Sequence, residues 1–493
     1  MREHIFSRHP LLVPFFGGLS GTLLEPTVIL VSFIALIIII KARKLPYSKF
    51  IFLFSCFSMV TSINQSIEFD DFNGRILRVE NGKEVVFQVK QIRELSSSDY
   101  LIAKCILKSI DEVIIKGKVN LIVNKRTPVS IGGVYYASYN LIHDTISDER
   151  FALFNYSRDL LGVMIVKEDD IYSLEGYFFN TFAFTEKIKK VILGVSRNYL
   201  TDFSNNLYQR TFLGIKNNFS IEQLKGFKVA GVMHALTISG MHLAIIFGVL
   251  ISPVKLLMRK WNITKWLKLL ILPFLWLYSE ITGGAPPVER ALIFISISVL
   301  CSLILNRKIR IKDLIFTVGT LFLIFQPNSI FDVSVQLSFS AVFGIAWIVP
   351  LLKLCWIPKN LALDFIWSSI CMTIGCTIST VPFILYYFGE ISSGFLLGNL
   401  ILGPLLTIWV IICLVVSVLV LMNYDFFYVF GYKIMNALSS WIEYVCVQFN
   451  VMKIPIFRVN GFTFLHLVIC YIFIVGCLIF FINLEESKSD RIL

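Results

Sequence analysis

Charged residues are scarce in this chain of 493 residues: Asp, Glu, Lys and Arg make up 16% of it, whereas hydrophobic residues make up 56%. So few charges cannot cover the surface of a soluble globular protein of this length. Apolar runs of spanning length recur instead, at 229–250, 266–281, 288–305, 333–352, 363–388, 395–422, 426–449 and 462–482. We therefore predict a polytopic α-helical membrane protein with about ten spans.

Cysteine and histidine are present without the spacing of a metal site. The chain has ten Cys and six His, and no Cys-x-x-Cys pair or zinc-type Cys/His cluster. Only Cys105 lies in the polar insert at 65–185, so that insert cannot form an internal disulfide. The sequence thus predicts no metal and no cofactor. A Walker motif is also missing, so the chain cannot act as its own nucleotide-driven motor.

Composition divides the chain into five parts. We expect membrane anchor helices at 1–64, an external β-rich domain at 65–185, basic amphipathic interfacial helices at 186–228, a helical channel domain at 229–484 and a short tail at 485–493. Basic loops after 40, after 254 and after 306 all belong on the cytoplasmic side by the positive-inside rule. This orientation predicts a multi-pass protein of the cytoplasmic membrane with the β-rich domain on its external, or periplasmic, side.

The polar insert has the signature of short strands. Segments 74–79, 84–90, 100–107 and 118–123 alternate or cluster β-branched residues, and Asn81-Gly82 suits a hairpin turn. Such strands in about a hundred residues suggest an OB-like barrel. Its aromatic residues either stack bases or fill a core. The candidates are Tyr135, Tyr136, Tyr139, Phe151 and Tyr156. The net charge of −3 over 68–185, from fourteen basic and seventeen acidic residues, argues against tight DNA binding by this domain and favours a place in the core for most of these aromatic residues.

The following segment, 186–228, is basic and amphipathic, with eight basic and three acidic residues. It is either a helix lying on the membrane surface or a funnel that attracts phosphates at the outer mouth of a conduit. The basic candidates for such a mouth are Lys187, Lys190, Arg197, Arg210, Lys216, Lys225 and Lys228.

Segment 230–243, Ala-Gly-Val-Met-His-Ala-Leu-Thr-Ile-Ser-Gly-Met-His-Leu, places polar groups inside the apolar run 229–250. Such groups are costly in a bilayer and by default indicate a pathway or a site. If the run is one helix, His234 and His242 are separated by about 12 Å of rise and about 80° of rotation, so they cannot share an ion unless the helix breaks at Ser239-Gly240. The imidazoles either hydrogen-bond neighbouring helices or line a polar conduit.

Four further polar residues are candidates in later apolar segments: Glu280, Arg290, Gln336 and Asn399. Arg290 either reaches the surface in a local ion pair or contacts phosphate, since a guanidinium matches phosphate geometry. Gln336 either joins helices or lines a pore. Asn399, with Gly403-Pro404 after it, marks a half-helix or a simple kink.

Together these segments resemble the ComEC-type competence channel family. Its hallmark run is matched by Gly231, His234, Ile238, Ser239, Gly240 and His242, and further blocks are matched at 285–291, at 327–339 and at 382–405. The resemblance implies a channel that carries single-stranded DNA inward during natural transformation. It also implies a periplasmic or surface DNA-binding competence protein and a cytoplasmic motor or single-strand-binding proteins as partners, besides the lipid bilayer.

One departure from the family concerns strand degradation. Longer members add a metallo-β-lactamase-like domain, and no His-x-His-x-Asp-His cluster occurs here. We therefore expect no enzyme activity and, where degradation is needed, a separate nuclease. Two other classes stay open: a secondary transporter of small anionic solutes, and an intramembrane serine hydrolase built on Ser239, for which Thr237-Ile-Ser-Gly240 lacks the first glycine of the Gly-x-Ser-Gly motif.

Overall fold

The computed structural model describes a large part of the chain, from Arg75 to Ser489 with gaps: residues 75–76, 79, 84–94, 100–111, 113–125, 127, 129–142, 158–166, 171–174, 181–215, 219–257, 264–304, 310–325, 327–452 and 454–489. These residues form two compact units. The first comprises those before Ile188 together with Asp313–Val335, and the second comprises Ile188–Lys312 together with Gln336 onward. The anchor helices predicted at 1–64 lie outside the described residues. Of the tail predicted at 485–493, residues 485–489 belong to the last helix, which ends at Ser489, and 490–493 lie outside the described residues.

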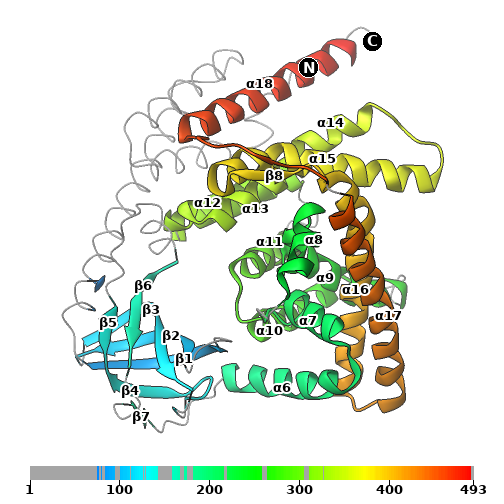
Figure 1. Ribbon diagram of the computed structural model, residues 1–493. Coiled ribbons are helices and arrows are strands. Elements are labelled where there is room, and N and C mark those ends of the chain that lie inside the picture. The colour runs from blue at the N-terminus through cyan, green and yellow to red at the C-terminus, as the bar shows by residue number, and fades with distance from the viewer. Residues whose placement is uncertain are drawn as a thin grey trace. The chain divides into compact units, whose positions relative to one another are not determined.

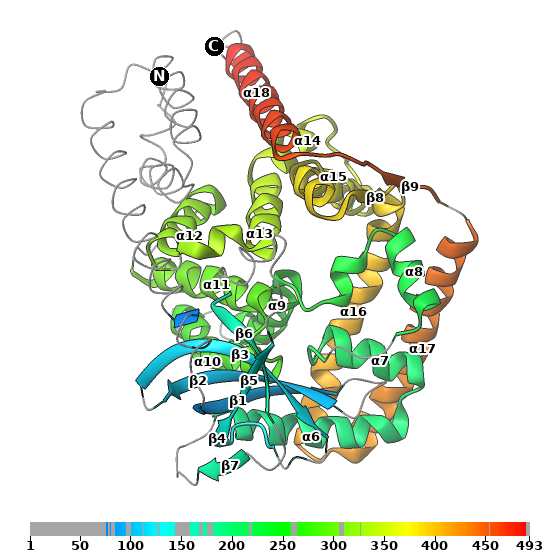
Figure 2. The same cartoon turned by 60° about the vertical axis from the view of Figure 1, so that its left-hand side comes forward.

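The first unit is built on a seven-stranded sheet (Figures 1 and 2), in the order β5-β6-β3-β2-β1-β4-β7. Neighbouring strands are antiparallel except β3 and β6, which are parallel. The strands are β1 (Glu84–Glu94), β2 (Tyr100–Ile110), β3 (Val113–Asn124), β4 (Val134–Ser138), β5 (Asn140–Ile142), β6 (Leu160–Ile165) and β7 (Ile171–Leu174).

Alternation along the strands builds the core of this β domain. Val85, Phe87 and Val89 of β1 are at most 1% exposed, while the residues between them face outward, as the two-residue period of a strand requires. Tyr135 and Tyr139 are buried in the same core, so the prediction that most aromatics pack inside is confirmed for these two. The β-rich domain is confirmed, and its OB-like classification stays a prediction.

One predicted strand is wrong. Segment 74–79 contains β-branched residues, yet Arg75, Ile76 and Val79 are helical. Ile76 and Val79 both pack on the core of the β domain. Their spacing of three residues puts both side chains on one helix face, which explains why a helix buries them and a strand would not.

The helices follow in chain order and belong to the second unit, except the beginning of α6, α12 from Asp313 onward, η3 and the start of α13, which belong to the first unit. They are α6 (Thr181–Tyr199), α7 (Asp202–Thr211), α8 (Ile221–Val229), η2 (Met233–Leu236), α9 (Gly240–Leu257), α10 (Thr264–Ile281), α11 (Pro286–Ile304), α12 (Ile311–Phe325), η3 (Pro327–Phe331), α13 (Val333–Phe343), η4 (Gly344–Ile348), α14 (Val349–Leu354), α15 (Leu361–Phe388), α16 (Phe395–Leu421), α17 (Asp425–Val451) and α18 (Phe464–Ser489). A short antiparallel pair, β8 (Glu390–Ser392) and β9 (Ile456–Arg458), joins the segments after α15 and α17.

The core of the second unit is centred on α16. Trp409 and Tyr208 are fully buried, and the Tyr208 hydroxyl lies 2.6 Å from the Ser417 hydroxyl. The Trp409 indole N–H donates to Thr211 Oγ1 at 3.0 Å. Helix α17 lies along α16 in both views (Figures 1 and 2). These contacts join α7 of the basic segment to the later apolar helices, so 186–228 is part of the same packed unit.

Five helical stretches among the described residues are long and apolar enough to cross a bilayer: 286–303, 333–354, 361–388, 395–421 and 464–481. Their burial within the protein is low, between 11% and 39%, as expected when lipid covers the remaining surface. A multi-pass membrane protein is thereby confirmed. The larger count of about ten spans stays a prediction.

Candidate functional site

The candidate segment 229–243 is not one helix, contrary to the prediction. Helix α8 ends at Val229, a 3₁₀ turn covers Met233–Leu236, and α9 begins at Gly240. The break begins at Gly231, whose φ of +70° is a left-handed conformation that glycine adopts without strain. The helical separation expected for His234 and His242 therefore does not apply. Hydropathy missed the break because the residues on both sides of it are apolar.

Close backbone contacts pack this segment against the start of α16. A Cβ at Gly231 would lie 2.7 Å from Phe395 Cα, and a Cβ at Gly398 would collide with the carbonyl oxygen of Ala230. The Ser392 hydroxyl donates to the carbonyl oxygen of Val229. Glycine is thus needed on both sides of this interface, at Gly231 and at Gly398. The interface brings together two of the sequence blocks that resemble the competence channel family.

Ser239 and His242 form the N-terminal cap of α9. The Ser239 N–H donates to His242 Nδ1 at 3.0 Å, and Ser239 Oγ lies 3.0 Å from the same nitrogen. Because Nδ1 accepts a hydrogen bond, the neutral ring has its hydrogen on Nε2. His242 is fully buried, and within the described part of the chain Nε2 has no hydrogen-bond partner. This buried N–H therefore has no acceptor among the described residues.

The same cap occurs at a second helix. At the start of α18, the Thr463 N–H donates to His466 Nδ1 at 3.2 Å, and Thr463 Oγ1 lies 2.7 Å from that nitrogen. This contact is exposed, whereas the one at His242 is buried. Ser/Thr-x-x-His is a variant of the capping box, in which the third residue accepts from the backbone N–H of the cap. The sequence contains this signal, although hydropathy and the usual Glu or Gln capping pattern do not reveal it.

The starts of α9 and α11 touch at Gly240. An added Cβ there would lie 3.2 Å from the Cβ of Ala291. The next residue toward the N-terminus of α11, Arg290, is 3% exposed, which argues against the interpretation that its guanidinium reaches the surface. Glu280, near the end of α10, has a buried carboxylate oxygen without a hydrogen-bond partner among the described residues. Helices α9, α10 and α11 pack on one another, so these polar groups share one region.

The other three predicted residues, Asn399, Gln336 and His234, occupy different surroundings. Asn399 Nδ2 donates to the carbonyl oxygen of Phe395 one turn earlier at 2.8 Å. Helix α16 continues through Gly403 and Pro404 to Leu421, so the half-helix interpretation is wrong there. Gln336 is half-buried on α13. His234 is exposed. No group of three or more His, Cys, Asp or Glu in the described ranges could hold a metal ion.

The basic candidates on 186–228 differ in exposure. Lys187, Lys190 and Arg197 on α6 and Lys225 on α8 are exposed. Arg210 is half-buried with its guanidinium 5.6 Å from the centre of the Phe219 ring, and Lys228 pairs with Glu390 at 2.5 Å. Lys216 lies outside the described residues. Five of the candidates are therefore exposed: Lys187, Lys190 and Arg197 on α6, and Lys225 and Lys228 on α8, of which Lys228 forms an ion pair.

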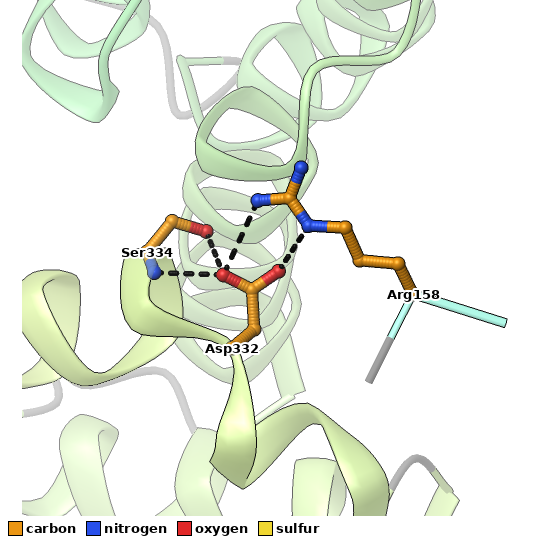
Figure 3. Close-up of polar contacts among 3 residues, drawn as sticks. All are labelled: Arg158, Asp332 and Ser334. Atoms are coloured by element: carbon orange, nitrogen blue, oxygen red, sulfur yellow. Dashed lines mark hydrogen bonds and ion pairs between the residues drawn. The ribbon is translucent and has the colours of Figure 1, made fainter. Parts of the chain in front are cut away.

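A contact that sequence reasoning missed lies in the first unit (Figure 3). Asp332, between η3 and α13, is 3% exposed and accepts from Arg158 Nε at 2.9 Å and from the Ser334 N–H at 2.7 Å. Burial alone would raise the pKa of the Asp332 carboxyl, but the hydrogen bonds from Ser334 and Arg158 and the Arg158 charge outweigh it, so the pKa is lowered from its ordinary value. Asp332 is therefore a buried carboxylate.

Comparison with known proteins agrees with the resemblance. A family model described as "Competence protein" matches residues 212–484. ComE operon protein 3 of Bacillus subtilis (strain 168) is 26% identical over 273 residues, which are 55% of this chain and 33% of that protein. The matched part thus corresponds to about a third of that relative's length. No solved structure matches.

Proposed function

Because the chain belongs to the competence protein family, we propose that it takes part in DNA uptake during natural transformation, as a channel for single-stranded DNA across the cytoplasmic membrane. The observation that carries this proposal is the polar region around the start of α9. There a buried imidazole N–H and a buried carboxylate oxygen lack hydrogen-bond partners among the described residues, and Arg290 is buried on α11, which packs against α9 and α10. Such groups persist in a membrane protein at a cost in free energy, which favours a functional role.

The chemistry of these groups suits a polyanion. The His242 Nε2–H is a donor, and a guanidinium such as that of Arg290 can hold two phosphate oxygens. A neutral imidazole and a single guanidinium form a sparse lining, so a phosphate bound there can also be released to the next position. Because His242 and Arg290 are buried, DNA can pass along them only when α9 and α11 separate at the contact of Gly240 with Ala291.

The other parts of the proposal concern the surroundings of the channel. The β domain, as an OB-like domain on the external side, and the exposed basic residues of α6 would receive the strand. A surface DNA-binding protein would deliver it, a cytoplasmic motor or single-strand-binding protein would pull it, and a separate nuclease would remove its complement. About ten spans would enclose the path.

A serine hydrolase is the second candidate, and one distance favours it. Ser239 Oγ lies 3.0 Å from His242 Nδ1, within the reach of a nucleophile and its base. Two observations weigh against it. In the described part of the chain His242 Nε2 has no partner that would orient the ring, and the Thr463–His466 contact shows that helix capping alone produces this geometry. A fluorophosphonate label lost in Ser239→Ala would nevertheless establish the hydrolase.

The decisive experiment uses the cysteine pair Gly240→Cys and Ala291→Cys. The 3.2 Å separation of these Cβ positions is close to the range of about 3.5–4.5 Å that a disulfide spans. Oxidation should lock α9 to α11, abolish entry of labelled DNA into the cytosol, and leave surface binding intact. A reductant should restore entry, and each single cysteine is the control. Normal entry through the cross-linked protein would exclude a path between these helices.

Deletion of the gene tests the role itself. We expect transformation frequency to fall to background and to recover with the wild-type gene on a plasmid. Normal transformation by the deletion strain would refute the proposal, whatever the outcome of the cross-link.

A further inference from the structure

Asp332 has two sets of partners, on either side of its carboxylate (Figure 3). Within its own segment, Oδ1 accepts from the Ser334 N–H at 2.7 Å and from the Ser334 hydroxyl at 2.5 Å, which caps the start of α13. From the β domain, Arg158 donates through Nε to Oδ2 at 2.9 Å and through Nη2 to Oδ1 at 3.5 Å. The two residues are 174 positions apart in the sequence. One carboxylate therefore serves a helix end and a distant domain at once.

Arg158 is held firmly on the side of the β domain. It precedes Asp159, which has a φ of 55°. The Asp159 carbonyl oxygen accepts from the Lys118 N–H at 3.0 Å, and β6 begins at the next residue. Since β6 pairs with β3, the turn that contains Arg158 is attached directly to the sheet.

An apolar contact lies beside the ion pair. Phe331, directly before Asp332, packs against the hydrophobic core of the β domain. The side chain of Asp332 is 4% exposed and that of Arg158 is 37% exposed, so the acid is covered while the base is partly solvated. A buried carboxylate that loses its charged partner is left as an uncompensated buried charge, so breaking this ion pair is costly in free energy.

We propose that Asp332 is a positioning residue, which fixes the beginning of the membrane helix at 333–354 to the β domain. The cap and the ion pair share one carboxylate, so the start of α13 at Val333 and the seating of the β domain on Phe331 and Asp332 stabilise each other. This assigns a role that does not involve a conduit to the block at 327–339, which resembles the competence family: Phe331 and Asp332 dock the β domain. The effect of this contact on transport rests on the proposed function, whereas the contact itself does not.

Substitutions can separate the two sets of partners. Asp332→Asn keeps an oxygen that caps α13 but removes the charge that Arg158 needs, and Arg158→Ala removes the other half of the pair. Arg75→Ala is the matched control, because it breaks the neighbouring Arg75–Asp159 pair entirely within the β domain. Asp332→Ala removes the cap and the pair together.

Hydrogen exchange on the full-length protein in detergent is the readout independent of DNA. We expect the amides at the start of α13 to lose protection at least about tenfold in Arg158→Ala and Asp332→Asn, and more in Asp332→Ala. Arg75→Ala should leave these amides unchanged. Unchanged protection in Arg158→Ala, or equal loss in Arg75→Ala, would overturn the proposal.

Transformation frequency at equal protein level is the second readout. Arg158→Ala and Asp332→Asn should each lower it about tenfold, and the double variant should be no worse than either single one, since both remove the same interaction. Additive losses in the double variant would overturn a shared role. If the deletion strain transforms normally, the proposed function falls, while the exchange experiment still decides whether Asp332 positions α13.

Discussion

The Cα of Gly398 faces the carbonyl oxygen of Ala230 so closely that no side chain fits between them. This contact ties the break in the candidate segment to the first turns of α16. A second glycine on the same helix, Gly403, has open space where its Cβ would lie. The two glycines therefore form a natural pair for testing whether close backbone packing matters at this site.

Gly398→Ala should destabilise the protein by about 1–3 kcal/mol or more, because the methyl group forces α16 away from Ala230. Gly403→Ala should change stability by less than about 1 kcal/mol, because the higher helix propensity of alanine is offset by the contact of its Cβ with the ring of Pro404. Thermal unfolding in detergent measures both variants. Equal midpoints for the two would show that the contact with Ala230 contributes nothing.

His242→Ala and His466→Ala remove the same kind of helix cap in buried and exposed surroundings. We expect His466→Ala to cost about 0.5–2 kcal/mol and to leave DNA uptake within about twofold of wild type. His242→Ala should reduce uptake at least about tenfold at equal protein level, since it also removes the buried Nε2–H.

His242→Gln separates capping from the buried donor at the same position. Glutamine completes the ordinary Ser-x-x-Gln capping box, so the stability of the protein should recover. Uptake of labelled DNA should stay low, because the amide does not reproduce the imidazole N–H. Full recovery of uptake in this variant would restrict His242 to capping.

Thr211→Val measures how much the buried hydrogen bond between Thr211 and Trp409 contributes to stability. Thr211 Oγ1 accepts from the Trp409 indole N–H and donates to the carbonyl oxygen of Leu207 at 2.7 Å. Valine has the same shape but leaves the indole N–H unpaired, which should cost about 1–3 kcal/mol of unfolding free energy. Thr211→Ser keeps the hydroxyl and is the control. A similar loss in both variants would assign the effect to packing.

Asp332 should make stability depend on pH on the acid side. Its carboxyl has a lowered pKa in the folded protein, so its contribution is fully present above the ordinary aspartate pKa of about 3.9 and is lost as the pH falls through the folded value. Asp332→Asn should be less stable than wild type at neutral pH, and the difference should shrink in acid. A difference that stays constant down to about pH 2 would contradict this linkage.

Composition and periodicity were sufficient to predict the class of fold. Long apolar runs predicted the spanning helices at 361–388 and 395–421, and the two-residue alternation around Phe87 predicted β1. Hydropathy failed at Gly231, because it averages over the very residues whose backbone conformation breaks the helix. The polar residues of the candidate site were visible as exceptions in an apolar run, which is a local property.

The partners of those residues were not predictable in the same way. The cap at Ser239–His242 is local and could have been found from Ser-x-x-His. The bond of Asp332 to Arg158 depends on how chain segments 174 positions apart come together, and neither residue is unusual in its own neighbourhood. A turn preference is encoded within a few residues, whereas a long-range ion pair follows only from the complete fold.

The span 333–354 contains the π-helical turn η4, at Gly344–Ile348, between α13 and α14. A π turn accommodates one residue more than an α turn, so every side chain of α14 is rotated by about 100° from where an unbroken helix would put it. The span that begins at Val333 therefore presents different faces before and after this turn. Removing a single residue from η4 would rotate α14 about the helix axis relative to α13, and Lys353 would then face a different direction. The π turn therefore sets the orientation of one half of the span relative to the other.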